Sequence, residues 1–279
     1  MIKGLVFGTG FIGTRIAEHK GYKTISRRYT NVLQLRDLEN FLENKKLEVV
    51  INAIGATGRP NIDWCEDNKK ETLESNVMAA QNLGLVCAKN NIYFVHLGSG
   101  CIYYGDNNGK GFSEDDELNF YGPQFYAKTK ILAEKFLKEI PSLILRVRMP
   151  IDDRPHERNL INKLSKYSKV IDAQNSMTTV PHMLLAVDKL IERKKLGIYN
   201  LVNPGTISAY EIMVMYKELV NPKHEFEKFS ISELDKKTKG KRSNCYLNSD
   251  KLISEGIKMP EIHQAVEECL EKYKDYIQR

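Results

Sequence analysis

Gly8-Thr9-Gly10-Phe11-Ile12-Gly13 is the stretch that decides the fold, because it joins an apolar run at residues 2–7 to a helical pattern. Glycines at this spacing permit a tight turn and a close approach of the backbone to a pyrophosphate. The start of the following helix supplies N–H donors and a positive dipole end. A glycine turn can also be purely structural, but the strand before it and the helix after it favour a ligand. The sequence therefore predicts a dinucleotide site formed by Gly8, Thr9, Gly10, Phe11, Ile12 and Gly13.

Short apolar runs alternate with helical patterns along the rest of the chain. Strands are predicted at residues 2–7, 24–25, 49–54, 93–97, 143–147 and 198–202, and helices at residues 71–90 and 124–139. This alternation is typical of βαβ units. It predicts an α/β fold, a Rossmann-like doubly wound parallel sheet with helices on both faces.

The same pattern suggests how the chain divides. We expect residues 1–150, rejoined by about 178–204, to form the NADP-binding Rossmann domain. Residues 151–177 and 205–279 then form a smaller substrate-binding lobe at the carboxyl edge of the sheet, with a helical, charged tail from Gly205 onward.

Composition narrows the class of protein. The chain has 279 residues, a net charge of +6 and five cysteines without framework spacing, which indicates reduced thiols and a cytoplasmic protein. No apolar run is long enough to span a bilayer, and the N-terminus resembles a strand rather than a signal peptide. The spread of basic residues favours an anionic small ligand over nucleic acid or a membrane. No His or Cys spacing resembles a metal site.

The second predicted strand ends in Ser26-Arg27-Arg28, where an NAD site would place an acidic residue for the ribose 2′-hydroxyl. Two guanidinium groups instead suit a 2′-phosphate. Arg27 and Arg28 therefore favour NADPH, although two solvated arginines are the alternative. Asn52, Ala53 and Gly55 end the next major strand and are expected to line the cofactor groove, unless they are plain turn residues.

A second group of residues suits hydride reduction of a ketone. Tyr126 and Lys130 lie four apart, on one face of a predicted helix that follows the turn at Gly122-Pro123. An ammonium beside a phenol favours the ionised phenol, so this tyrosine can give a proton to a carbonyl oxygen. Ser99 and Cys101 lie two apart at a predicted strand end, so their side chains point the same way. The alternatives are an exposed Tyr–Lys pair and a small buried cysteine.

The glycine motif, Ser99 and the Tyr126–Lys130 spacing together resemble the extended short-chain dehydrogenase/reductase superfamily. Longer stretches, covering nearly the whole chain, are similar to the plant nucleotide-rhamnose synthase/epimerase-reductase family, which is related to bacterial dTDP-4-dehydrorhamnose reductases. These stretches are Asn52-Ala-Ile-Gly-Ala-Thr-Gly-Arg-Pro-Asn-Ile-Asp-Trp-Cys65, Gly100-Cys-Ile102, Phe125-Tyr-Ala-Lys-Thr-Lys130, Leu145-Arg-Val-Arg-Met-Pro-Ile151, Asn175-Ser-Met-Thr178 and Gly197-Ile-Tyr-Asn200. The glycine turn departs from the family's GxxGxxG by one residue, which changes the geometry of the loop.

The resemblance implies a bifunctional enzyme of nucleotide-sugar metabolism. It would epimerise C3 and C5 of a UDP- or dTDP-4-keto-6-deoxy-D-glucose and reduce C4 with NADPH, giving a nucleotide-activated L-rhamnose. In the superfamily, the residue that matches Ser99 binds the substrate oxygen and the one that matches Tyr126 is the acid/base. The residue that matches Lys130 tunes the tyrosine and holds the nicotinamide ribose, so Tyr126 and Lys130 are also expected at the cofactor. Cys101 is then the expected carbon base. Lys163 is the expected opposing acid, in place of the His of related GDP-fucose synthases.

The resemblance also implies a substrate site and an assembly. The expected substrate-binding residues are Thr57, Arg59, Asn159, Asn175 and Arg242, the last on the diphosphate. A homodimer through two helices beside the site is expected, as is common in the superfamily. Plant members often carry a dehydratase domain upstream, and we expect this chain to lack that step. Alternatively, Lys163 and Arg242 are ordinary solvated residues on the surface.

The sequence is also compatible with two other functions. One is a plain 4-reductase that receives a substrate already epimerised. The other is a non-catalytic NADP-binding regulatory subunit, like the regulatory subunit of methionine adenosyltransferase. The presence of Ser99, Tyr126 and Lys130 speaks against the regulatory subunit.

Overall fold

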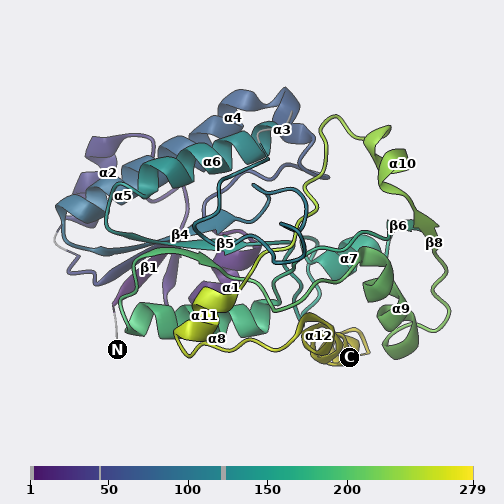
Figure 1. The fold of residues 1–279 in the computed structure, drawn as a ribbon. Coiled ribbons are helices and arrows are strands. Elements are labelled where there is room, and N and C mark those ends of the chain that lie inside the picture. The colour runs from purple at the N-terminus through teal and green to yellow at the C-terminus, as the bar shows by residue number, and fades with distance from the viewer. Residues whose placement is uncertain (1–2, 44, 121–123, 279) are drawn as a thin grey trace. The chain divides into compact units, whose positions relative to one another are not determined.

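The computed structural model describes residues 3–43, 45–120 and 124–278, and it divides the chain into two compact units (Figure 1). The first unit comprises residues 1–102, 121–146 and 190–199. The second comprises residues 103–120, 147–189 and 200–279. Residues 103–120 belong to the second unit because Gly105 and Phe112 form β-bridges with Cys245 and Leu247. The predicted division into a cofactor-binding part and a substrate-binding part stays a prediction.

A six-stranded sheet with the order β2-β1-β3-β4-β5-β7 forms the centre of the fold. Its strands are β1 (Gly4–Phe7), β2 (Lys23–Ile25), β3 (Val49–Asn52), β4 (Tyr93–Ser99), β5 (Ser142–Val147) and β7 (Gly197–Asn200). β1 pairs in parallel with both β2 and β3, and β3 pairs in parallel with β4. The strand order reverses between β1 and β3, and open α/β sheets bind ligands at such a switch point. The predicted Rossmann-like α/β fold with a parallel sheet is confirmed.

Helices cover both faces of this sheet in the first unit (Figure 1). Helix α1 (Phe11–Lys20) lies on one face, and α2 (Leu35–Leu42), α5 (Ala79–Lys89) and α6 (Phe125–Leu137) lie on the other. Their apolar stripes pack onto the strands, which bury Leu38, Leu83, Phe94, Leu137 and Ile144 completely. This core fixes the strand ends on which the site residues lie.

The predicted helix at residues 71–90 is confirmed in its extent but not in its geometry. It begins as α4 (Lys69–Leu73), continues as one π-helical turn, η1 (Glu74–Met78), and ends as α5. A short helix, α3 (Trp64–Asp67), precedes it. π-Turns inside helices are rare and occur frequently at functional sites. Nothing in the hydrophobic pattern indicated this one.

The second unit has its own core and a two-stranded parallel sheet of β6 (Lys169–Ile171) and β8 (Glu227–Phe229). Its helices are α7 (Leu160–Leu164), α8 (Val180–Glu192), α9 (Ala209–Leu219), α10 (Ile231–Asp235), α11 (Asp250–Ser254) and α12 (Ile262–Ile277). Ile161, Ile212, Val266 and Leu270 are fully buried in this core. The prediction of a helical tail was therefore wrong over β8, a short strand whose charged residues gave no alternating pattern.

The ends of several predicted strands also differ. Ile54 and Leu201 lie beyond their strands, whereas β4 continues to Ser99. Ile2, at the start of the first predicted strand, lies outside the described residues, as does the predicted turn at Gly122-Pro123. Among the described helices, none is long and apolar enough to cross a bilayer.

A buried ion pair joins helix α6 to strand β5. Arg146 donates from Nε to Glu134 Oε2 at 2.9 Å and from Nη2 to Glu134 Oε1 at 2.8 Å. The two side chains are only 1% and 4% exposed. This bidentate geometry gives each charge a partner, which is what makes burial of the two charges tolerable.

We predict that Glu134→Ala lowers the free energy of unfolding by about 3–5 kcal/mol, because Arg146 is left as a buried charge without its carboxylate. Denaturant unfolding at neutral pH measures the change. Glu139→Ala, at an exposed position just after the same helix, should change it by no more than about 0.5 kcal/mol. The double variant Glu134→Leu/Arg146→Met, in which both charges are replaced by apolar side chains, should recover most of the free energy of unfolding that Glu134→Ala loses. Equal stability of wild type and Glu134→Ala would contradict the structural role of the pair.

Candidate functional site

The glycine turn between β1 and α1 has the backbone geometry of a phosphate site. Gly8 has a φ of +113°, and a Cβ at this position would lie 2.7 Å from the Ala53 carbonyl group. A Cβ on Gly13 would lie 2.4 Å from the Gly8 oxygen. Both positions therefore require glycine. At Gly10, the N-cap of α1, a Cβ would meet nothing within 4 Å, so the first turn of the helix is open to a ligand.

The first turn of α1 contains no acidic residue and has no side-chain cap on its N–H groups. The helix begins directly after the carboxyl end of β1, beside the switch point of the sheet. N–H groups and a positive dipole end in this place suit an anion. The residues present therefore fit the pyrophosphate of a dinucleotide.

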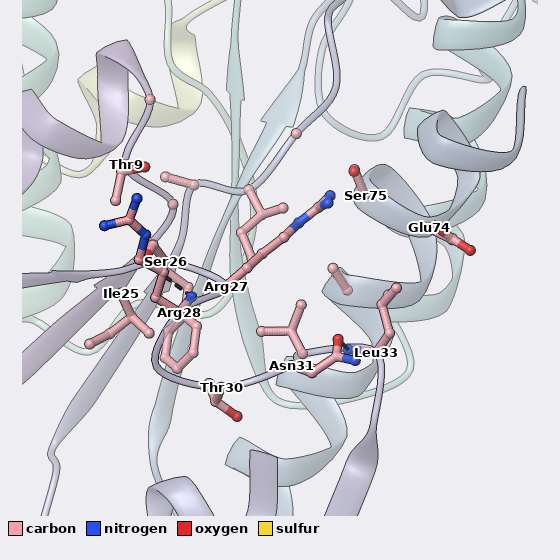
Figure 2. Close-up of a pocket in the computed structure, with 18 residues that line it drawn as sticks. Thr9, Ile25, Ser26, Arg27, Arg28, Thr30, Asn31, Leu33, Glu74 and Ser75 are labelled. Atoms are coloured by element: carbon pink, nitrogen blue, oxygen red, sulfur yellow. Dashed lines mark hydrogen bonds between the residues drawn. The ribbon is translucent and has the colours of Figure 1, made fainter. Parts of the chain in front are cut away.

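A cavity of about 440 Å³ opens beside this turn (Figure 2). Its lining comes from the glycine turn, the end of β2 and the π-turn, and it includes Arg27, Arg28, Asn31 and Ser75. The two guanidinium groups point to opposite sides of the cavity, one toward Thr9 and one toward Ser75 (Figure 2). The cavity is thus positively charged at the end of β2, where a 2′-phosphate would be held.

Asn52 ends strand β3, directly before residues that line the cavity. Its side chain is fully buried, with Nδ2 3.1 Å from His96 Nδ1 and Oδ1 accepting the Ile54 N–H at 3.0 Å. Burial, followed by the nearby Lys130 charge, holds the pKa of His96 well below its usual range. Neutral His96 and Asn52 therefore fix the backbone at Ile54, which lines the cavity between Ala53 and Gly55. Contact of Asn52, Ala53 and Gly55 with a cofactor stays a prediction.

Four polar residues lie in the first turns of α6 and at or just after the end of β4. Ser99 is the last residue of β4 and is 4% exposed, and Tyr126 and Lys130 on α6 are 8% and 6% exposed. Cys101 lies just beyond the strand, and its N–H donates to Ser99 Oγ at 3.1 Å. Because Ser99 Oγ accepts this bond, its own hydrogen can be directed at a ligand oxygen.

Lys130 is the electrostatic centre of this group. Its Nζ donates to the Leu97 carbonyl of β4 at 3.0 Å. Burial lowers the pKa of Lys130 to about 8, and the attraction of Cys101 and Glu134 partly opposes this shift. The Cys101 thiol is therefore within electrostatic reach of the ammonium. A phenol, an ammonium, a hydroxyl and a thiol are groups that can move a proton to or from a ligand oxygen or carbon.

Asn76 is the functional residue that the sequence analysis missed. The π-turn carries this fully buried side chain, whose Oδ1 accepts the Ala56 N–H at 2.7 Å. Its Nδ2 donates to the Ala56 oxygen at 3.1 Å and to Thr129 Oγ1 at 3.0 Å. Asn76 thus binds the segment after Gly55 to helix α6. A π-turn leaves no signature in hydrophobic spacing, so no signal in the sequence indicated this role.

The expected substrate residues of the first unit, Thr57 and Arg59, are exposed. They follow Gly55 in a segment that leads to α3. Their place on an accessible loop after the switch-point strand is compatible with ligand contact, which stays a prediction.

Two expected substrate residues of the second unit instead have structural bonds. Asn159 caps α7: its Oδ1 accepts from Ile161 N and Asp152 N, and its Nδ2 donates to the Asp152 and Arg154 oxygens. Asn175 Oδ1 accepts from Arg148 and Cys245 N, and its Nδ2 donates to the Ala173 oxygen and to Asn244. An amide has two donor and two acceptor positions, and both amides are saturated. Both amides thus use their hydrogen-bonding positions within the protein, and substrate contact at Asn159 and Asn175 stays a prediction.

Lys163 and Arg242 lie in the same unit. Lys163 is half-buried in the last turn of α7, and burial, followed by the Arg158 charge, lowers its pKa. This makes Lys163 a stronger proton donor than an exposed lysine. Arg242 is partly exposed, and its Nη1 donates to the Gly240 oxygen at 3.2 Å.

The five cysteines are free thiols, and only Cys101 is not buried. Within residues 3–43, 45–120 and 124–278, no group of three or more His, Cys, Asp or Glu side chains is arranged to hold a metal ion.

Comparison with known proteins places these features in a family. The bifunctional dTDP-4-dehydrorhamnose 3,5-epimerase/dTDP-4-dehydrorhamnose reductase of Arabidopsis thaliana is 36% identical, over 96% of this chain and 91% of that protein. A trifunctional UDP-glucose 4,6-dehydratase/UDP-4-keto-6-deoxy-D-glucose 3,5-epimerase/UDP-4-keto-L-rhamnose-reductase of the same plant is 37% identical over 98% of this chain. The chain spans only 41% of that longer relative.

Solved structures agree with this assignment. The crystal structure of a UDP-rhamnose synthase from Acanthamoeba polyphaga mimivirus has a TM-score of 0.89 and 31% identity, and the match covers 97% of this chain and 99% of that one. A dTDP-4-dehydrorhamnose reductase from Bacillus anthracis, solved in complex with NADP, shares the fold at 17% identity, with a TM-score of 0.81 and full coverage of both chains. The family model for the RmlD substrate binding domain matches residues 4–275, and the chain therefore belongs to the RmlD substrate-binding-domain family.

Proposed function

We propose that this protein is an NADPH-dependent, bifunctional 3,5-epimerase and 4-reductase that converts a UDP- or dTDP-4-keto-6-deoxy-D-glucose to the corresponding nucleotide L-rhamnose. The observation that carries the proposal is the group of Ser99, Cys101, Tyr126 and Lys130, because it joins a ketone-reducing set to a thiol. The Arabidopsis bifunctional relative, of which the chain covers 91%, supports the same reading.

Reduction needs the proton donor and the charges that hold it. NADPH, bound along the glycine turn with its 2′-phosphate near Arg27 and Arg28, would supply a hydride to C4 of the sugar. Ser99 donates a hydrogen bond to the C4 oxygen, and Tyr126 transfers its phenolic proton to that oxygen as negative charge develops. The Lys130 ammonium then stabilises the phenolate that Tyr126 becomes.

Epimerisation uses the same ketone before it is reduced. The C4 carbonyl acidifies the protons on C3 and C5, and Ser99 and Tyr126 stabilise the enolate that forms when one is removed. The Cys101 thiolate takes the carbon proton on one face of the sugar. Lys163, whose pKa is lowered by burial, is the proposed donor of a proton to the opposite face. A plain 4-reductase would use the same residues without the two carbon proton transfers.

Binding of the nucleotide sugar is assigned to a smaller set of residues than the sequence suggested. Thr57 and Arg59 in the first unit and Arg242 in the second are the proposed contacts, with the Arg242 guanidinium on the diphosphate. We also propose that the protein forms a homodimer.

We predict a preference for NADPH over NADH, because Arg27 and Arg28 replace the acidic residue of an NAD site. Replacing both with Ala should raise KM for NADPH roughly 10–100-fold, as expected for charge-assisted bonds, and should change KM for NADH little. Arg36→Ala is the control, since Arg36 is exposed on α2 and does not line the cavity. Equal use of both cofactors by the wild type would contradict the prediction.

We predict that reduction slows as the pH rises through about 8, the pKa to which burial lowers Lys130. Above this pH Lys130 loses its charge, and the phenolate of Tyr126 loses its stabilisation. The measurement is kcat/KM for reduction across about pH 6–10. Lys130→Arg stays charged over that range and should lack this falling limb, although its activity is lower. An unchanged limb in Lys130→Arg would assign the titration to another group.

The experiment that tests the bifunctional reading is incubation of UDP- or dTDP-4-keto-6-deoxy-D-glucose in deuterium oxide without NADPH, followed by mass or NMR analysis. Wild type should incorporate deuterium at C3 and C5, and Cys101→Ala should not. Tyr126→Phe should lose about 10²–10⁴-fold in reduction, and Lys163→Ala should permit proton removal while suppressing inversion.

Absence of exchange in the wild type, together with rapid reduction of a sugar already epimerised, would leave a plain 4-reductase. Binding of NADPH without turnover of any 4-keto sugar would instead favour the regulatory subunit.

A further inference from the structure

Helix α6, which carries Tyr126 and Lys130, begins without a cap of its own. Its N-cap residue, Gln124, makes no side-chain cap bond, and its first turn contains no acidic residue. The first N–H groups of a helix have no partner within the helix and need an acceptor from elsewhere. Here the Phe125 N–H donates to Oε1 of Glu66 at 2.6 Å. The cap is thus a carboxylate that lies 59 positions earlier in the chain.

Ala56 lies at the other end of the segment that leads to Glu66, and it is connected to helix α6 through Asn76. Asn76 binds both backbone groups of Ala56 and donates to Thr129 Oγ1. Thr129 Oγ1 in turn donates to the carbonyl oxygen of Tyr126 at 2.8 Å. Residues 56–66, here called the tethered segment, are therefore attached at both ends to the first turns of α6.

Two further distances place the residues on either side of this segment near helix α6. A Cβ on Gly55, the residue just before the tethered segment, would lie 3.9 Å from Lys130 Nζ. Lys69, which follows the segment, has its Nζ 5.8 Å from the centre of the Phe125 ring. Thr57 and Arg59 lie between the two attachments and are exposed. The segment proposed to bind the sugar and the turn that carries the proton donor are thus one connected structure.

We propose that Glu66 is a positioning residue that sets Tyr126 for proton transfer and ties its place to the tethered segment. This rests on the proposed function, because it assigns Tyr126 as the proton donor. Tyr126 is the second residue of α6, and an N-terminal turn without a cap frays readily. The Glu66 carboxylate satisfies the Phe125 N–H and interacts favourably with the positive end of the helix dipole. Substrate held by the tethered segment then meets a phenol whose position the same segment fixes.

Two substitutions separate the hydrogen bond to the Phe125 N–H from the negative charge of Glu66. Glu66→Gln keeps an oxygen acceptor and removes the charge, whereas Glu66→Ala removes both. The matched control is Glu71→Gln, an exposed carboxylate on the neighbouring helix α4. Glu66→Ala should lower kcat for reduction about 10–100-fold, as small displacements of a reacting group do, with KM for NADPH unchanged. Glu66→Gln should lie between Glu66→Ala and the wild type, and Glu71→Gln should equal the wild type.

Hydrogen–deuterium exchange, read by mass spectrometry, tests the attachment without any turnover. Peptides covering residues 125–130 should exchange faster in Glu66→Ala, and less so in Glu66→Gln. Peptides from α12 should exchange as in the wild type, which excludes general destabilisation. Unchanged exchange at 125–130, or faster exchange with unchanged kcat, would overturn the positioning role.

The two proposals fail in different ways. A wild type that reduces no 4-keto sugar overturns the proposed function and the role of Tyr126 with it. The exchange result then still supports or overturns the attachment of Phe125 to Glu66. A loss of kcat in Glu66→Ala with a parallel rise in KM for NADPH would point to a disturbed cofactor site and would overturn the proposal.

Discussion

The buried ion pair between Arg146 and Glu134 is the constraint on which the reactive group depends. It attaches helix α6 to strand β5 where neither charge reaches water, so neither side chain can leave without exposing the other to a low dielectric. Glu134 lies one turn after Lys130 on the same helix, and its charge also stabilises the Lys130 ammonium. One carboxylate therefore fixes the helix and moderates the electrostatics of the group that the helix carries.

Burial of Lys130 is costly for folding, and the structure retains it. The lysine bridges from α6 to the Leu97 carbonyl, two residues before Ser99 on β4. The same burial that lowers its pKa to about 8 also leaves its charge to interact with Cys101 and Glu134 in a medium of low polarity. An exposed lysine would be cheaper to charge, but its field would be screened by water. Burial of Lys130 thus lowers the stability of the fold and strengthens the local field of the ammonium, which is common where proton transfer is required.

The features of this fold that depend on local residues are predictable from the sequence. The turn at residues 8–13 and the Tyr126–Lys130 spacing depend on neighbours within one turn or strand, and the described structure confirms both geometries. Features that depend on partners distant in the chain are not predictable in this way. The cap on Phe125 comes from Glu66, and the anchor of Ala56 comes from a π-turn, and neither produces a period in the sequence. Short charged strands such as β8 were missed because they lack an alternating apolar face.

Asn159 and Asn175, which were expected to bind the substrate, have a structural role in the second unit. Asn159 and Asn175 use all four hydrogen-bonding positions of their amides within the second unit. Asn175 and the buried Arg148 hold residues 243–245, which follow Arg242 directly in the chain. Replacement of such an asparagine would therefore disturb the backbone that it holds, whether or not its side chain contacts the ligand. A motif residue with a saturated amide is best read as support for its exposed neighbours, which leaves recognition of the sugar nucleotide to side chains such as Arg242.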